Sequence, residues 1–198
     1  MDSETPKTNK RLISTVVIIL LILVTGYLIY KNSNSSNTAT IPDYFADSTS
    51  WKEFNSVEGS FRVTLPTLPK HESNTVAIPG SDLTGTVDLY SSSQGDTSYF
   101  IQAISYNSEI DVSNPHAVLE GAFNGRVSEI PNHKIISSDF GNFISHDALD
   151  YVIQSDSYYI YGKLVLVGQK LYSFEMACES SKCSNSDYQK FTSSFQLQ

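Results

Sequence analysis

The sequence predicts an α+β domain in which helices sandwich an antiparallel β-sheet (an α/β/α sandwich), and it predicts one transmembrane helix before that domain. Three observations support this fold class. Residues 12–30 form an apolar run without a charged side chain. Several later runs alternate apolar and polar residues and end at short turns, as the strands of a half-buried sheet do. Two further segments repeat apolar residues at the spacing of a helix.

The apolar run at residues 12–30 is the predicted membrane anchor. As a helix, Ile13 to Tyr30 would span roughly 27 Å, which is enough to cross the hydrocarbon core of a bilayer. Three basic side chains precede the run and only Lys31 closely follows it, so the positive-inside rule places residues 1–11 in the cytoplasm as a short tail. We therefore expect a single-pass protein of the cell membrane whose C-terminal domain is extracytoplasmic.

A cleaved signal peptide is the main alternative to this anchor. The apolar run is long for a signal peptide, and Thr38-Ala39-Thr40 is a poor and distant cleavage site. An uncleaved anchor is therefore favoured.

The next segment, residues 31–43, is a predicted flexible linker because Ser, Asn and Thr dominate it and no apolar period appears. Residues 44–198 then supply roughly 150 residues, a common size for one domain with one core. From Lys52 to Gln198, nine basic side chains stand against seventeen acidic ones, a formal charge of −8. This charge disfavours nucleic acid and anionic lipid surfaces as partners of the domain, and a cationic partner or simple solubility fits it better.

The first half of the domain reads as strands. Phe61, Val63 and Leu65 alternate with polar residues, and Pro66 ends the run because it lacks a backbone donor. Three more strands are predicted at residues 72–78, 84–92 and 98–106. The connections between them are short, which favours antiparallel neighbours.

A helix is predicted after these strands. Asn114 suits the N-cap and Pro115 suits the first helical position, and apolar residues then recur at helical spacing until Pro131. Gly121 and Gly125 lie inside this helix, where glycine costs about 1 kcal/mol relative to alanine. They suggest a close approach of the helix to the sheet.

The second half returns to strands and closes with a helix. The predicted strands are residues 134–140, with a turn at Gly141-Asn142, then 143–155, 158–167 and 171–178. The strand at 158–167 carries apolar side chains on both faces, so we expect it to be central and covered on both sides. Ser184 is the predicted cap of a last helix that carries Tyr188, Phe191 and Phe195.

Two parts of the domain resemble a known family. The opening WKEFNSVEGSFRVTLPTLP at residues 51–69, and the ending in which LYSF at 171–174 precedes FTSSF at 191–195, are similar to bacterial domains related to the PsbP and Mog1 proteins. The resemblance implies a PsbP/Mog1-like fold over most of residues 51–198. It also implies binding rather than catalysis, since such domains include a photosystem accessory protein, a small-GTPase partner and many membrane-anchored bacterial proteins of unknown role. No family site motif is present to transfer a functional residue.

Cys178 and Cys183 are the only cysteines of the chain. The predicted topology places them in a non-reducing compartment, which favours a disulfide over two free thiols. Closing so short a loop would stabilise the fold by about 2 kcal/mol in the chain-entropy model. A zinc site is disfavoured because no second cysteine pair and no nearby histidine complete four ligands.

The remaining candidates for a site are weaker. The four histidines are scattered, and the neighbours in Ser145-His146-Asp147 would point to opposite faces of a strand, so neither pattern predicts a catalytic site. The carboxylate pairs 109/111 and 147/150 are expected to be solvated. Tyrosines on the predicted strands could form a stacking groove for a glycan or peptide, although packing alone favours aromatic residues in strands. These binding candidates are Tyr158, Tyr159, Tyr161 and Tyr172.

Three functions agree with these patterns. The favoured one is a non-catalytic binding or accessory module at the outer face of the membrane, with a protein partner in the cell envelope and without a cofactor. An extracytoplasmic hydrolase with an unrecognised site is the alternative, and a structural envelope component that self-associates is the third. The sequence names no ligand and no oligomeric state.

Overall fold

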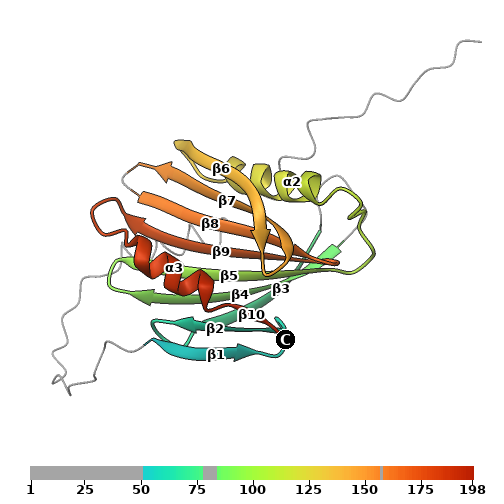
Figure 1. Ribbon diagram of the computed structural model, residues 1–198, viewed down its shortest axis with the longest axis horizontal. Helices are drawn as coiled ribbons and strands as arrows, with labels where there is room; N and C mark the ends of the chain where they lie inside the picture. Colours follow the sequence, from blue (N-terminus) through green and yellow to red (C-terminus); the bar gives the residue numbers. More distant parts are fainter. Residues whose placement is uncertain (1–50, 78–83, 157) are drawn as a thin grey trace, which may run out of the picture.

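A computed structural model describes residues 51–77, 84–156 and 158–198, which form two antiparallel sheets and two helices (Figure 1). The large sheet has seven strands. In spatial order they are β3 (Lys70–Ala77), β4 (Thr84–Gln94), β5 (Thr97–Tyr106), β9 (Lys170–Glu179), β8 (Tyr158–Val167), β7 (His146–Ser155) and β6 (His133–Phe143). The small sheet consists of β1 (Lys52–Ser56), β2 (Phe61–Leu65) and β10 (Gln196–Leu197), with β2 in the middle.

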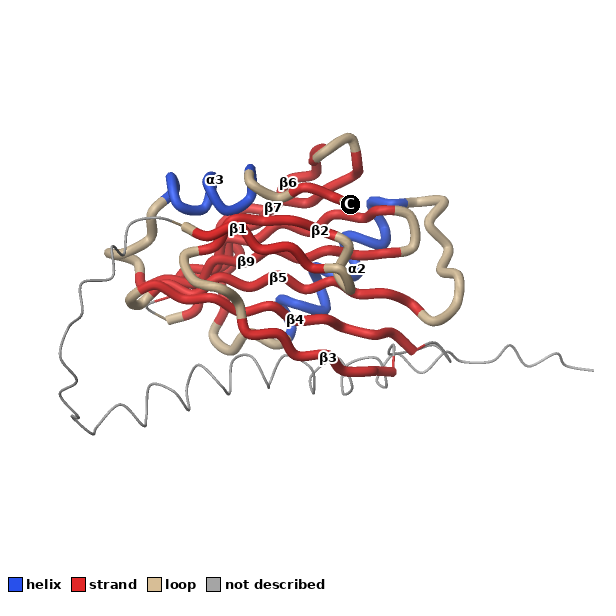
Figure 2. The backbone as a smooth tube through the Cα atoms, turned by 90° about the horizontal axis from the view of Figure 1, so that it is seen from below, coloured by secondary structure: helices blue, strands red, loops and turns tan. Residues whose placement is uncertain are grey.

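The two helices lie on opposite faces of the large sheet (Figure 2). Helix α2 (Pro115–Ser128) covers β7 and β8, while α3 (Asn185–Ser193) lies on the other face beside the small sheet. The predicted α+β class with an antiparallel sheet is confirmed. The expectation that helices alone cover both faces is incomplete, because the strand predicted at residues 61–65 leaves the large sheet and joins the small one.

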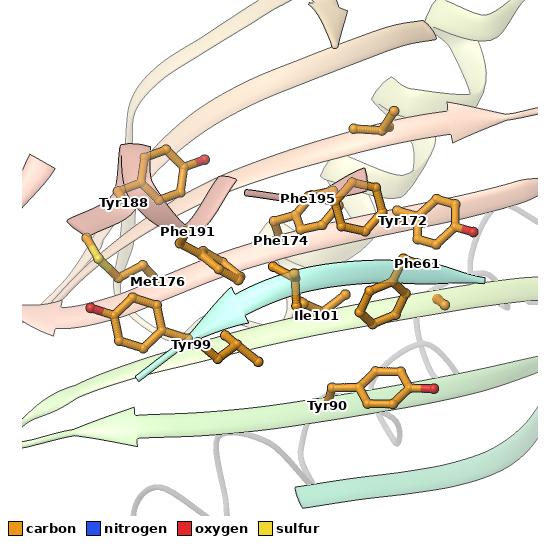
Figure 3. Close-up of a cluster of buried hydrophobic side chains, with 14 of the residues drawn as sticks. Phe61, Tyr90, Tyr99, Ile101, Tyr172, Phe174, Met176, Tyr188, Phe191 and Phe195 are labelled. Carbon is orange, nitrogen blue, oxygen red and sulfur yellow. The ribbon is translucent and has the colours of Figure 1, made fainter. Parts of the chain in front are cut away.

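The larger core cluster fills the space between the large sheet, the small sheet and α3 (Figure 3). Alternate residues of β9 point into it because successive side chains of a strand face opposite sides. Tyr172, Phe174 and Met176 therefore meet Phe61 of the small sheet and Phe191 of α3. Phe174 lies edge-on to Phe195, with ring centroids 4.4 Å apart. This cluster joins the two sheets into one domain.

A second cluster lies beneath α2. Leu119, Phe123 and Val127 of the helix face Leu149 and Leu164 of the sheet, and all five are buried. The apolar residues on both faces of β8 thus enter two separate cores, as its pattern predicts. The strand in the middle of the sheet is nevertheless β9, so the prediction that residues 158–167 are central is displaced by one strand.

Both helices have the N-cap residues that the sequence predicts. The Asn114 side chain accepts a hydrogen bond from the Ala117 amide at 3.2 Å, and the Ser184 side chain accepts one from the Asp187 amide at 3.2 Å. The close approach expected at Gly121 is wrong, because a Cβ built there meets no atom within 4 Å.

The hairpin after α2 also differs from the prediction. β6 continues through Gly141 and Asn142 to Phe143, and the chain turns at Ile144 and Ser145 instead. Both turn residues have positive φ, at 50° and 63°. Gly141 offered a local turn signal, but pairing along the full length of β7 overrides it.

The predicted anchor and linker, residues 1–43, lie outside the described residues. Among the residues that are described, no helix combines the length and apolar character needed to span a bilayer.

Candidate functional site

The large sheet has two edges within the described residues, β3 and β6, and they differ in chemistry. β3 reads KHESNTVA, and its first five residues are polar or charged and exposed. Polar residues and lysine are how native proteins protect an edge strand from pairing with other chains. β6 reads HKIISSDFGNF and differs in that large apolar side chains are exposed among its polar residues.

Four large apolar residues are exposed along β6 and its turn, and we call them the β6 edge surface. They are Ile135 (44% exposed), Ile136 (46%), Phe140 (46%) and Ile144 (43%). Single apolar residues on a surface are ordinary, but several of them along one edge strand indicate an interaction site.

Helix α2 borders this surface at its N-terminal end. The His116 ring stacks on Phe140 with centroids 4.2 Å apart and an interplanar angle of 10°. The His116 Nε2 atom lies 3.6 Å from the Asp147 carboxylate of β7. The start of α2 and both strands of the β6–β7 hairpin therefore meet around one exposed aromatic ring.

The pairing of β6 with β7 leaves a regular edge on its other side. The register shifts between Ile135 and Ser137, so Ile136 forms a bulge, and pairing is then continuous from Ser137 to Phe143. In the described chain, the β6 backbone hydrogen bonds to other backbone groups through β7 alone. Half of its amides and carbonyls accordingly point away from the sheet.

A buried ionic cluster anchors the adjoining part of the sheet to α2. Arg126 donates from Nε and Nη2 to the two Glu175 carboxylate oxygens at 2.6 and 2.9 Å, and both side chains are less than 10% exposed. Burial disfavours the charged carboxylate, but attraction and hydrogen bonds from Arg126 outweigh it and hold the pKa of Glu175 below its usual value. The cluster fixes α2 (Arg126) to β9 (Glu175).

Tyr151 completes this cluster across the neighbouring strand. Its hydroxyl donates to Glu175 Oε1 at 2.5 Å, and burial raises its pKa well above the usual value. Gly162 lies in register between Tyr151 and Glu175. A Cβ built on Gly162 would overlap the Tyr151 ring, so the missing side chain is what allows the ring to cross β8.

Glu129 lies just beyond this cluster, at the C-cap of α2. Both of its carboxylate oxygens are buried and accept no hydrogen bond from a described residue. Nη1 of Arg126 is also buried and donates no hydrogen bond to a described residue. Burial raises the pKa of Glu129 to about 8, although Arg126 acts in the opposite direction. Glu129 is therefore the carboxyl group most easily protonated near neutral pH.

The two cysteines form a disulfide, as the sequence predicts. Cys178 at the end of β9 is bonded to Cys183 before α3, with Cα atoms 5.3 Å apart. The bond joins the middle strand of the large sheet to the helix that covers it.

The four candidate tyrosines do not share one surface. Tyr158 is 41% exposed on the α2 face of the sheet, whereas Tyr159 and Tyr161 point to the opposite face. The Tyr161 ring packs on Tyr188 of α3 at 5.7 Å, and Tyr172 is buried with its hydroxyl donating to the Gly59 carbonyl at 2.8 Å. The structure thus brings together no stacking groove from this set.

The two aspartates of the carboxylate pair 147/150 each contact a basic or titratable side chain. Asp147 contacts His116, and Asp150 pairs with Lys163 at 2.6 Å. In residues 51–77, 84–156 and 158–198, no group of three or more His, Cys, Asp or Glu side chains could hold a metal ion.

The seven-stranded antiparallel sheet, with one helix on each face, defines a PsbP-like α+β domain. Among solved structures, the chain is similar to cyanobacterial PsbP (CyanoP) from Synechocystis sp. PCC 6803, with a TM-score of 0.51 and 13% identity over 81% of this chain and 98% of that one. It is also similar to PA94, a protein of unknown function from Pseudomonas aeruginosa, with a TM-score of 0.37 and 10% identity over 66% and 84% of the two chains. Likeness at this level of identity shows the fold alone.

The resemblance noted in the opening and closing segments is therefore confirmed at the level of fold. No protein-family model and no curated protein sequence matches the chain.

Proposed function

We propose that this chain is a non-catalytic accessory protein, anchored by residues 12–30, whose extracytoplasmic domain binds a protein partner through the β6 edge surface. The observation that carries the proposal is the contrast between the two edges of one sheet. The exposed residues in the first part of β3 are charged or polar, while β6 exposes Ile135, Ile136 and Phe140 in addition to polar residues.

The physical argument rests on the cost of leaving such an edge open. An exposed strand with unpaired backbone groups and apolar side chains is a template for pairing with another chain. Burying three such half-exposed side chains would also remove apolar area from water, at about 25 cal/mol per Å². A partner strand satisfies both the backbone and the side chains.

A hydrolase is supported less well by the same structure. Its site would need an acid, a base and a nucleophile within hydrogen-bond reach of one another. Glu129 is a carboxyl with a raised pKa, yet the described groups that act on it are Arg126 and Glu175. Arg126 is not a nucleophile, and the Glu175 carboxylate is buried and already bonded to Arg126 and Tyr151.

Site-specific photo-crosslinking of the full chain in its own membrane tests the proposal. A benzophenone amino acid replaces Ile136 or Phe140 in the β6 edge surface, and it replaces Val57 or Leu68 as the control. The control side chains are 80% and 63% exposed but lie elsewhere on the domain. We expect a partner adduct of one defined mass from positions 136 and 140 only.

Three outcomes contradict the proposal. The first is the absence of adducts at all four positions, and the second is equal yield from the control positions. The third is an adduct with a second copy of the chain, which would support a self-associating envelope component instead. Turnover of a small ester or glycan by the purified full chain would favour the hydrolase.

A further inference from the structure

The charges around the β6 edge surface define the partner further. Asp139 is exposed on β6 itself, and Asp147 lies beside Phe140 on the neighbouring strand. Glu120 is exposed one helical turn beyond His116, on the same side of α2. Lys134 is the one lysine or arginine of β6, and Lys163, which lies over the Phe143 ring, is paired with Asp150, so the surroundings of this edge are acidic overall.

Alternation along β6 separates the apolar and acidic features. Phe140 pairs in register with Leu149 and lies on the α2 face, while Asp139 pairs with Asp150 and lies on the opposite face. A strand added beside β6 would place successive side chains next to Phe140 and next to Asp139 in turn. Ser137, Ser138 and Gly141 are small and leave room for larger partner residues.

A second copy of this chain fits the edge poorly. Each copy of the chain carries a formal net charge of −8. Two β6 strands side by side would also bring two acidic edges together, each with an exposed Asp139, and like charges close to one another across strands are destabilising. The electrostatics therefore favour a partner of opposite charge.

We propose that β6 binds an extended segment of the partner as an eighth strand of the large sheet, and that this segment alternates apolar with basic residues. The inference rests on the proposed function, since it names the binding mode and chemistry of the same surface. Backbone hydrogen bonds along Ser137–Phe143 supply affinity, Phe140 receives the apolar side chains, and the carboxylates select lysine or arginine.

Three synthetic peptides test this inference on the full chain in a neutral detergent. The probe is an eight-residue capped peptide that alternates lysine and valine, carrying a fluorophore for anisotropy. In the second peptide glutamate replaces lysine, and in the third every other backbone nitrogen is methylated so that strand pairing is blocked. We expect the lysine peptide to bind at least about tenfold more tightly than either of the others.

Variants of the chain then locate the binding site. Phe140→Ser is expected to weaken binding of the lysine peptide about tenfold, and Asp139→Asn about threefold, while the matched surface control Leu68→Ser leaves it unchanged. Raising the salt from 50 to 500 mM should weaken binding, since screening acts on exposed charges. Hydrogen exchange should show new protection of the β6 amides, and circular dichroism confirms that each variant is folded.

The outcomes separate the two proposals. Equal binding of the methylated or glutamate peptide, an equal effect of Leu68→Ser, or no binding of the lysine peptide overturns strand addition by a basic segment. If crosslinks from positions 136 and 140 persist in that case, the protein-binding function stands and only its mode is wrong. If those crosslinks are also absent, the proposed function fails as well.

Discussion

At the scale of single residues, Gly162 decides how the buried charges are satisfied. Its missing side chain lets the Tyr151 ring cross β8 and donate to Glu175, which also holds Arg126. An ion pair buried this deeply is costly unless its remaining hydrogen-bonding positions are filled. The glycine therefore acts through a contact that it does not itself make.

Gly162→Ala should destabilise the domain by about 1–3 kcal/mol, because the added methyl group overlaps the Tyr151 ring and displaces the hydroxyl from Glu175. Gly121→Ala is the matched control, since its methyl group meets no atom within 4 Å and alanine favours a helix. Urea unfolding of both variants should show loss of stability for Gly162→Ala and a small gain for Gly121→Ala. Equal midpoints would refute the proposed role of Gly162.

Glu129 should make stability depend on pH. Burial raises its pKa from 4.5 to about 8, so between these values the folded chain holds a proton that the unfolded chain has released. The free energy of unfolding therefore falls as pH rises from about 4.5 to 8, by at most about 1.4 kcal/mol per pH unit. Glu129→Gln should flatten this slope, and Asn124→Ala, an exposed position on the same helix, should not. An unchanged slope in Glu129→Gln would show that the group is not the source.

At the scale of elements, the disulfide links the middle strand of the large sheet to α3. Closing this short loop should contribute about 2 kcal/mol. Reduction, or Cys183→Ser, should lower the melting temperature by roughly 4–8 °C for a domain of this size. Thermal unfolding with and without reductant measures the shift, and the mass of the alkylated chain confirms the bond. A reduced Cys183→Ser variant gives no further shift if the bond is the cause.

Elements with local signals were predictable, and their neighbours in space were not. Asn114-Pro115 and Ser184 predict both helix starts because capping depends on adjacent residues. The alternation of β6 predicts a strand, but its place at the edge depends on the order of all seven strands. The exposure of Phe140 could not be inferred for the same reason.

The contacts of the buried cluster formed by Arg126, Glu175 and Tyr151 could likewise not be predicted from the sequence. Arg126 and Glu175 are 49 residues apart, and no spacing rule joins them. Gly162 was the available signal, because glycine inside a strand often marks the close approach of another group. The helix glycine Gly121 gave the same signal without such a contact.

At the scale of the whole molecule, the predicted anchor would determine the compartment in which the domain operates. The basic tail at residues 1–11, the apolar residues 12–30 and the linker 31–43 predict an extracytoplasmic acidic domain. The disulfide agrees with an oxidising compartment. A domain held there would meet only partners exposed outside the cytoplasm, so the function proposed for β6 depends on this orientation.

Protease treatment of right-side-out membrane vesicles tests that orientation. The chain carries one epitope tag at each end, and proteinase K is added outside. We expect cleavage in residues 31–43 to release the C-terminal tag with the folded domain, because Ser, Asn and Thr dominate this predicted linker while the domain has a packed core. The N-terminal tag should stay protected until detergent opens the vesicles, and inside-out vesicles should give the reverse pattern. Digestion of the N-terminal tag in right-side-out vesicles would place the domain in the cytoplasm, and it would contradict the anchor topology and the partner class together.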